Sequence, residues 1–293
     1  MVYSSNKKKY SGIIFLTEIY NPTVYRDFLA DNTFDYLYDK VGLYDVLRDV
    51  SCGYRPASDL TFTLYNVGDI QHKMVNFMEN NQEQRIASDY FLKSGKAGIA
   101  SIIVTACINR NPVMIYSGQE FGERGMDEEG YSGKNGRTTL FDYWSVDTLR
   151  RWNNHGKWDD ELLEEEEKRL HKFYSKLMTL CNHERALSQG LFYDLMPANY
   201  ENSEFDSARQ FAFVRSDEKD IILIVVNFDR VEKNIRVCIP DHVYSFFGID
   251  RLETGIIRPL LDENTKEIFF SPENPLTVKI KSNSGEIFKF HSL

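Results

Sequence analysis

The sequence predicts an α/β unit built on a parallel sheet, followed by an antiparallel β-sandwich. Two observations support this prediction. Up to about residue 120, short apolar runs alternate with helical patterns, and from about residue 190 short strands follow one another with turns between them. Strands that alternate with helices are typical of parallel sheets, whereas closely spaced short strands are typical of sandwiches. We therefore expect two domains, at residues 1–187 and 188–293.

Four apolar runs in the first half are predicted to be strands buried on both faces, at residues 12–17, 34–39, 74–78 and 112–116. Helical patterns follow at residues 23–30, 42–50 and 89–108. Polar residues stand directly after each strand, among them Glu18, Asp39 and Glu79. In a β/α barrel the carboxyl ends of the strands form the face that carries active sites. These polar residues are therefore the first candidates for a functional site.

The rest of the chain divides into three parts. Residues 122–158 are rich in Gly, acidic and aromatic residues and are predicted to be a long surface excursion. Residues 160–181 have apolar residues at helical spacing, and the acidic run 164–167 lies in the first turns, where it complements the helix dipole. Short strands are then predicted at 211–214, 221–228, 235–239, 276–280 and 287–290, as a sandwich with a core of its own.

Composition excludes several classes of function. A net charge of −9 argues against binding to nucleic acid or to an anionic membrane surface, and no apolar run is long enough to cross a membrane. The four cysteines form no C-x-x-C pair and the six histidines are scattered, so we expect no metal and no cofactor. Residues 1–10 lack a leader pattern, so the compartment is unknown and a cytoplasmic location is the default expectation.

Three motifs follow predicted strands in a set order. The segment Phe15-Leu16-Thr17-Glu18 is similar to the motif F-x-x-E. Residues 77–85 are similar to F-x-E-N-H-D-x-x-R, and residues 112–120 are similar to P-x-x-x-Y-x-G-x-E. These patterns belong to α-amylase-type enzymes, glycoside hydrolase family 13, which the chain resembles. The resemblance implies a partial TIM-type β/α barrel, strands five to eight, followed by the C-terminal β-sandwich of that family.

The resemblance also implies roles for individual residues. Glu18 takes the position of the general acid, and Tyr20, Asn81, Gln82 and Arg85 take substrate-binding positions. The family has His and Asp where this chain has Asn81 and Gln82, and the G-x-R-x-D motif of its nucleophile does not occur here. Retaining glycosidases need two carboxyl groups about 5 Å apart. Loss of one preorganised electrostatic group costs about 3–4 kcal/mol of transition-state stabilisation.

Three functions are compatible with the sequence. The first is a truncated and inactive glycoside hydrolase fragment; the second is a module that binds α-glucan or maltooligosaccharide without catalysis. The third is one half of a split glycoside hydrolase that needs an N-terminal half-barrel partner. In all three, a half-barrel alone leaves unpaired strand edges, which predicts self-association.

Structural explanations also compete with the functional ones for individual residues. Glu79 and Asn80 could cap the turn after their strand, and Arg85 could be a structural partner of a carboxylate. Aromatic residues of the excursion could stack on sugar rings or pack the excursion onto the barrel; they are Tyr131, Phe141, Tyr143, Trp144 and Trp152.

Overall fold

A parallel four-stranded sheet forms the first part of the molecule in the computed structural model, which describes residues 9–10, 12–127, 134–141, 143–262 and 266–291. The strands are β1 (Leu16–Thr17), β2 (Tyr36–Tyr38), β3 (Met74–Phe77) and β4 (Val113–Met114), in the order β1-β2-β3-β4. The predicted parallel sheet is confirmed, with strands shorter than the apolar runs. Because all four strands run the same way, the residues that follow them gather at one edge.

Helices connect these strands, as predicted, but their bounds differ. They are α2 (Tyr25–Leu29), α3 (Asp45–Cys52), α4 (Leu60–Asn66) and α5 (Ile99–Cys107), and a π-helical turn, Lys40–Tyr44, precedes α3. Helix α4 was not predicted from the sequence. Short 3₁₀ turns lie at Pro22–Val24, Ala30–Asn32, Ala57–Asp59, Gly68–Lys73, Gly95–Gly98, Gln119–Phe121, Tyr143–Ser145 and Asn154–Gly156.

The predicted helix at residues 89–108 was wrong over its first half, because only α5 is α-helical there. Residues 89–98 form turns, and Lys93 has a positive φ of 64°. Gly95 and Gly98 allow the chain to approach its neighbours closely: a Cβ at either position would lie 2.7 Å from Leu170 or Ile86, respectively. Tertiary packing therefore overrides the local helical pattern.

The excursion carries α6 (Asp147–Asn153), and α7 (Glu165–His183) follows it, with α8 (Arg185–Ser188) at its end. The predicted helix at 160–181 is confirmed, although it starts a few residues later. Its first turn is held by a capping box between Glu164 and Glu167. The acidic run therefore has a structural role at the amino end of α7.

The second part of the molecule is antiparallel. A six-stranded sheet has the order β10-β9-β12-β7-β6-β5, and a two-stranded sheet pairs β11 with β8. The strands are β5 (Leu191–Asp194), β6 (Gln210–Ser216), β7 (Ile221–Asn227), β8 (Lys233–Arg236), β9 (Gly255–Pro259), β10 (Ile268–Phe270), β11 (Thr277–Ile280) and β12 (Ser284–His291). Two short helices, α9 (Met196–Asn199) and α10 (His242–Phe247), accompany them. Strands β5, β9 and β10 were not predicted from the sequence.

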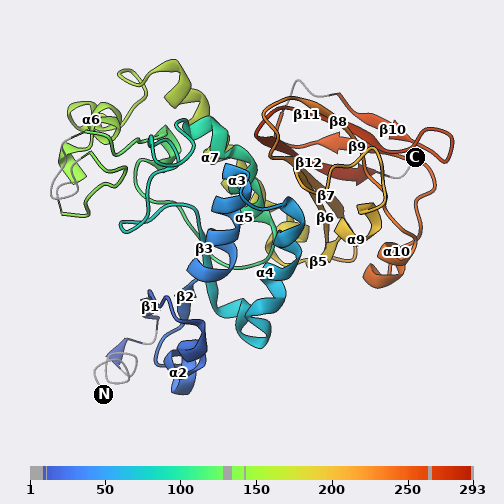
Figure 1. Ribbon diagram of the computed structural model, residues 1–293, viewed down its shortest axis with the longest axis horizontal. Helices are drawn as coiled ribbons and strands as arrows, with labels where there is room; N and C mark the ends of the chain where they lie inside the picture. The colour runs from blue at the N-terminus through green and yellow to red at the C-terminus, as the bar shows by residue number, and fades with distance from the viewer. Residues whose placement is uncertain (1–8, 11, 128–133, 142, 263–265, 292–293) are drawn as a thin grey trace.

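One hydrophobic cluster holds residues from both sides of residue 188, so the sandwich shares buried surface with the helices that precede it. Helix α5 contacts β3 on one side and β7 and β12 on the other, so it lies between the parallel sheet and the large antiparallel sheet (Figure 1). One hydrophobic cluster joins Ile103 of α5 and Leu177 of α7 to Val225 of β7 and Phe288 of β12. Both faces of β7 are buried, which explains its unbroken apolar sequence.

Candidate functional site at the carboxyl edge of the parallel sheet

Glu18 and Asn80 meet at the carboxyl edge of the parallel sheet. Glu18 follows β1 and Asn80 follows β3, and the side-chain amide of Asn80 donates to Glu18 Oε1 over 3.2 Å. The hydroxyl of Tyr20 donates to the same carboxylate oxygen. Burial, and then the Glu18 carboxylate, raise the pKa of Tyr20, so its hydroxyl is neutral and remains a donor. The structure therefore brings together Glu18 and Tyr20, two of the predicted site residues.

Lys40 adds a positive charge to this cluster, and sequence reasoning missed it. Its ammonium group lies 5.5 Å from the centroid of the Tyr20 ring, 3.4 Å from Glu83 Oε1 and 2.6 Å from Asp45 Oδ1. Glu83, also missed, accepts a hydrogen bond from the Tyr44 hydroxyl over 3.1 Å. Both residues stand next to residues singled out in the sequence, Lys40 after Asp39 and Glu83 after Gln82. Their position next to these residues was the only feature of the sequence that could have indicated a place in the site.

Asn80 caps the turn after β3, which is the structural alternative considered for it. Its Oδ1 accepts from the backbone N–H groups of Gln82 and Glu83, each over 2.8 Å. Asn81 is partly exposed and Gln82 is exposed at this turn. In the described part of the chain, neither side chain has a hydrogen-bond partner, whereas the backbone oxygen of Gln82 accepts from Arg137 over 2.6 Å. Asn81 and Gln82 therefore lie at the surface beside Asn80.

Arg85 is buried, with 1% of its surface exposed, and it forms an ion pair of 2.7 Å with the equally buried Glu79. Its guanidinium also donates to the carbonyl oxygen of Ser117 and to the hydroxyl of Thr138, and it stacks 4.2 Å from the Tyr116 ring centroid. These contacts fit the structural alternative for Arg85. They fasten the excursion, through Thr138, to the ends of β3 and β4.

The aromatic residues of the excursion differ in their environments. The Trp152 ring packs on the rings of Phe121 and His171, so it holds the excursion against α7. Phe141 and Trp144 are mostly exposed. Tyr131 and the side chain of Tyr143 lie outside the described residues. The excursion therefore carries exposed aromatic surface, as does Tyr20.

The cluster has the groups that bind neutral polyols: a carboxylate, a neutral phenol, an amide and an ammonium group. No group of three or more His, Cys, Asp or Glu side chains within the described residues is arranged to hold a metal ion. Among the same residues, no helix is both long and apolar enough to span a bilayer. The four cysteines are free thiols, and Cys107 Sγ lies 3.8 Å from Cys181 Sγ between α5 and α7.

Comparison with known proteins identifies the fold. No sequence model of a protein family matches the chain, and no curated protein does. Among solved structures, 99% of the chain superposes on 56% of an α-amylase from Geobacillus thermoleovorans complexed with acarbose, with a TM-score of 0.66 and 12% identity. It also superposes on 57% of a noncanonic maltogenic α-amylase from Thermotoga neapolitana, with a TM-score of 0.64 and 16% identity. An α-amylase from H. orenii matches with a TM-score of 0.64, 15% identity and 55% of its length.

The class of fold is thus a parallel β/α unit joined to an antiparallel sandwich. More specifically, it is the fold of the C-terminal part of α-amylases. The chain spans about half the length of the solved structures it matches.

Proposed function

We propose that this chain corresponds to barrel strands five to eight and the sandwich of an α-amylase-type protein, and that its rim binds α-glucan oligosaccharides without hydrolysing them by itself. One observation carries the proposal. The Glu18 carboxylate is held by Tyr20 and Asn80 at the rim, next to the uncharged Asn81 and Gln82. The site keeps hydrogen-bonding groups for a sugar but lacks the charge pattern of the reaction.

The chemistry supports the absence of turnover. A retaining mechanism needs a nucleophilic carboxylate about 5 Å from the acid, and the family's transition-state-stabilising Asp has been replaced by Gln82. The residues present can therefore position a sugar but cannot complete the reaction.

Two further observations support sugar binding. Solved structures of the same fold were determined with acarbose, maltose and maltotriose. In this chain, Tyr20 exposes 46% of its surface beside Glu18 and Lys40, so an aromatic face and polar groups adjoin at the rim. Such a combination of an aromatic surface with a few placed polar groups is typical of small-molecule sites.

Calorimetry with maltotriose tests the proposal. Tyr20→Ala should weaken binding roughly fivefold or more, since it removes an aromatic surface and a hydrogen-bonding hydroxyl. Tyr200→Ala is the matched control, because Tyr200 is equally exposed, at 47%, on the sandwich side of the chain. Equal affinities for both variants, or no binding by the parent chain, would contradict the proposed binding. Turnover of a chromogenic maltooligosaccharide that disappears in Glu18→Gln would contradict the noncatalytic part.

A second candidate function, one half of a split enzyme, is favoured by the outer strand β1. Ile14 and Leu16 expose 67% and 40% of their surfaces at this edge of the sheet, where an additional strand would cover them. The same edge would mediate self-association of the chain alone. Light scattering after size-exclusion chromatography should show association that Ile14→Lys reduces and Leu162→Lys, an exposed control, does not.

Complementation tests the split-enzyme candidate directly. The chain would be co-expressed with the N-terminal half-barrel of an α-amylase, with and without Asn81→His and Gln82→Asp. The double change should raise turnover of the complex roughly 100- to 1000-fold, because it restores a preorganised electrostatic group. Failure of the two halves to associate would reject this candidate and leave the binding proposal standing.

A further inference from the structure

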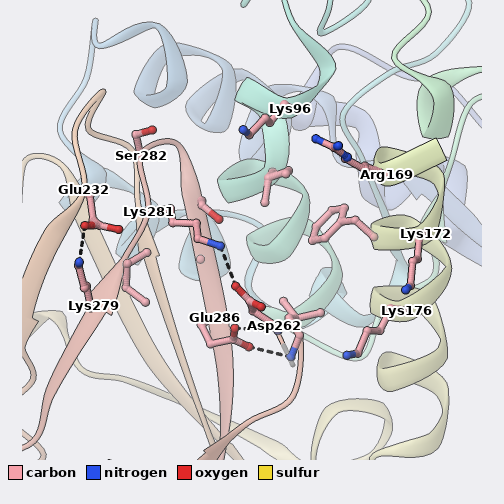
Figure 2. Close-up of a pocket in the computed structure, with 16 residues that line it drawn as sticks. Lys96, Arg169, Lys172, Lys176, Glu232, Asp262, Lys279, Lys281, Ser282 and Glu286 are labelled. Carbon is pink, nitrogen blue, oxygen red and sulfur yellow. Dashed lines mark hydrogen bonds and ion pairs between the residues drawn. The ribbon is translucent and has the colours of Figure 1, made fainter. Parts of the chain in front are cut away.

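A cleft of about 650 Å³ lies between helix α7 and the antiparallel sheets, and none of the rim residues lines it (Figure 2). Helix α7 contributes one wall, together with Lys96 of the 3₁₀ turn Gly95–Gly98 and Ile99 at the start of α5. Strands β11 and β12 and the segment between them contribute the other wall. The partly buried side chains of Phe173, Ile99 and Leu261 add apolar surface to the cleft. The volume is in the range of sites for small molecules.

Positive charge dominates the cleft although the whole chain carries −9. Three carboxylates line it, those of Glu232, Asp262 and Glu286. Six cationic side chains also line the cleft: Lys96, Arg169, Lys172, Lys176, Lys279 and Lys281. An excess of cations that converge on one hollow of an acidic protein focuses a local positive potential there.

The three carboxylates are already engaged by neighbouring groups. Glu232 pairs with Lys279 and Asp262 with Lys281, each over 2.7 Å. Glu286 is buried and accepts from the backbone N–H groups of Leu261 and Asp262 over 2.8 Å and 3.0 Å. Two of the three carboxylates therefore pair with lysines of the sheet side of the cleft.

Three cations on the helical side of the cleft are different. Within the described residues, Lys96, Arg169 and Lys172 form no ion pair, whereas the neighbouring Lys168 pairs with Glu165 over 3.5 Å. Arg169 and Lys172 stand three residues apart on α7, where like charges destabilise a helix, and both line the cleft. The Arg169 side chain extends from α7 into the cleft (Figure 2). Lys96 lines the cleft from the 3₁₀ turn Gly95–Gly98, just before α5 (Figure 2).

We propose that this cleft binds the phosphate group of a small phosphorylated molecule. A phosphate monoester carries about −1.5 to −2 charges at neutral pH and has three acceptor oxygens. Arg169 would present its planar set of donors to two of these oxygens, while Lys172 and Lys96 would supply point charges from two sides. Phe173 and Ile99 would contact the uncharged part of the ligand. A singly charged carboxylate would leave most of this charge uncompensated.

Titration calorimetry with pyrophosphate on the full chain, in phosphate-free buffer of low ionic strength, tests the proposal. We expect one saturable site whose affinity falls as salt is added, because the cleft is open to solvent. The double variant Arg169→Gln/Lys172→Gln should weaken binding roughly tenfold or more, through the loss of two charge-assisted contacts.

The matched control is Lys157→Gln/Lys168→Gln. It removes the same net charge, but Lys157 and Lys168 are paired with Glu161 and Glu165 and do not line the cleft. Its affinity should stay within about twofold of the parent. An equal loss in both double variants, no saturable binding by the parent, or acetate binding as tight as pyrophosphate binding would each overturn the proposal. Thermal melts of all variants exclude a loss of fold as the cause.

Discussion

The guanidinium of Arg215, on β6 of the sandwich, donates to the carbonyl oxygen of Cys107, the last residue of α5, over 2.6 Å. It also donates to the carbonyl oxygens of Asn109, Leu187 and Gly190 over 2.8–2.9 Å, and the side chain is fully buried. Burial lowers the pKa of Arg215 to about 10, so it stays charged at neutral pH. A cation therefore satisfies carbonyl groups at the end of α5, in the favourable direction for the helix dipole.

Arg215→Met should lower the free energy of unfolding by about 3 kcal/mol or more, because five buried or partly buried carbonyl oxygens lose their donor. Urea denaturation of the full chain measures this loss. Arg236→Met is the control, since Arg236 forms an exposed pair with Glu204 and should change stability by less than about 1 kcal/mol. If both variants lost the same free energy of unfolding, the buried hydrogen bonds of Arg215 would stabilise the chain no more than the exposed ion pair of Arg236 does.

A fragment of residues 188–293 should not form a cooperative folded unit. In the full chain, Phe213, Val225 and Phe288 share one hydrophobic cluster with α5 and α7, so the fragment would expose that face to water. Arg215 would also lose its contact with Cys107. Near-ultraviolet circular dichroism and thermal melts check this. A sharp melting transition of the isolated fragment would mean that the sandwich is stable without the helices.

Arg85→Met should destabilise the chain by about 3–5 kcal/mol, because it leaves the Glu79 carboxylate buried without its partner. The double variant Glu79→Met/Arg85→Met removes both charges, so it should recover a large part of that loss. Equilibrium denaturation of the two single variants and the double variant gives the coupling energy. If the losses of stability in the two single variants simply added up in the double variant, Glu79 and Arg85 would not be energetically coupled.

The parts of the fold that sequence reasoning predicted share one property: their pattern is local. The unbroken apolar run of β7 follows from burial of both faces, and the acidic start of α7 follows from its capping box. Residues 89–98 have a helical pattern as well, but they form turns, and Gly95 packs so close to α7 that a Cβ there would lie 2.7 Å from Leu170. That contact joins positions far apart in the chain, so no local pattern could reveal it.

The residues of the candidate site also divide into those with a local sequence pattern and those brought together only by the fold. Glu18 could be found because a motif surrounds it, and the uncharged Gln82 could be read directly against that motif. Lys40 and Glu83 could not be found, because their roles arise only when the turn after β2 meets the turn after β3. Likewise, Arg85 stands in a motif, yet its burial against Glu79 depends on the excursion that supplies Thr138.

Asp39 should make stability depend on pH. It is buried at the end of β2, and its carboxylate accepts from the backbone N–H of Leu43 over 2.9 Å. Burial raises the pKa of Asp39 from its ordinary value of 3.8 to about 6, with a smaller contribution from Asp45. Folded Asp39 thus holds its proton more tightly than the unfolded chain does, and its contribution to stability is complete below about pH 4 and lost as the pH rises through about 6.

Asp39→Asn removes this titration while keeping a side-chain oxygen that can accept from Leu43. Relative to the parent, the variant should therefore gain stability between pH 4 and pH 7, by up to about 3 kcal/mol for a pKa difference of about two units. Urea denaturation of both chains at pH 4, 5, 6 and 7 measures the difference, in which the titration of all other groups cancels. Asp241→Asn, at an exposed carboxylate paired with Arg251, is the control and should give a nearly constant difference. A constant difference for Asp39→Asn as well would show that Asp39 is ionised in the folded chain throughout this range.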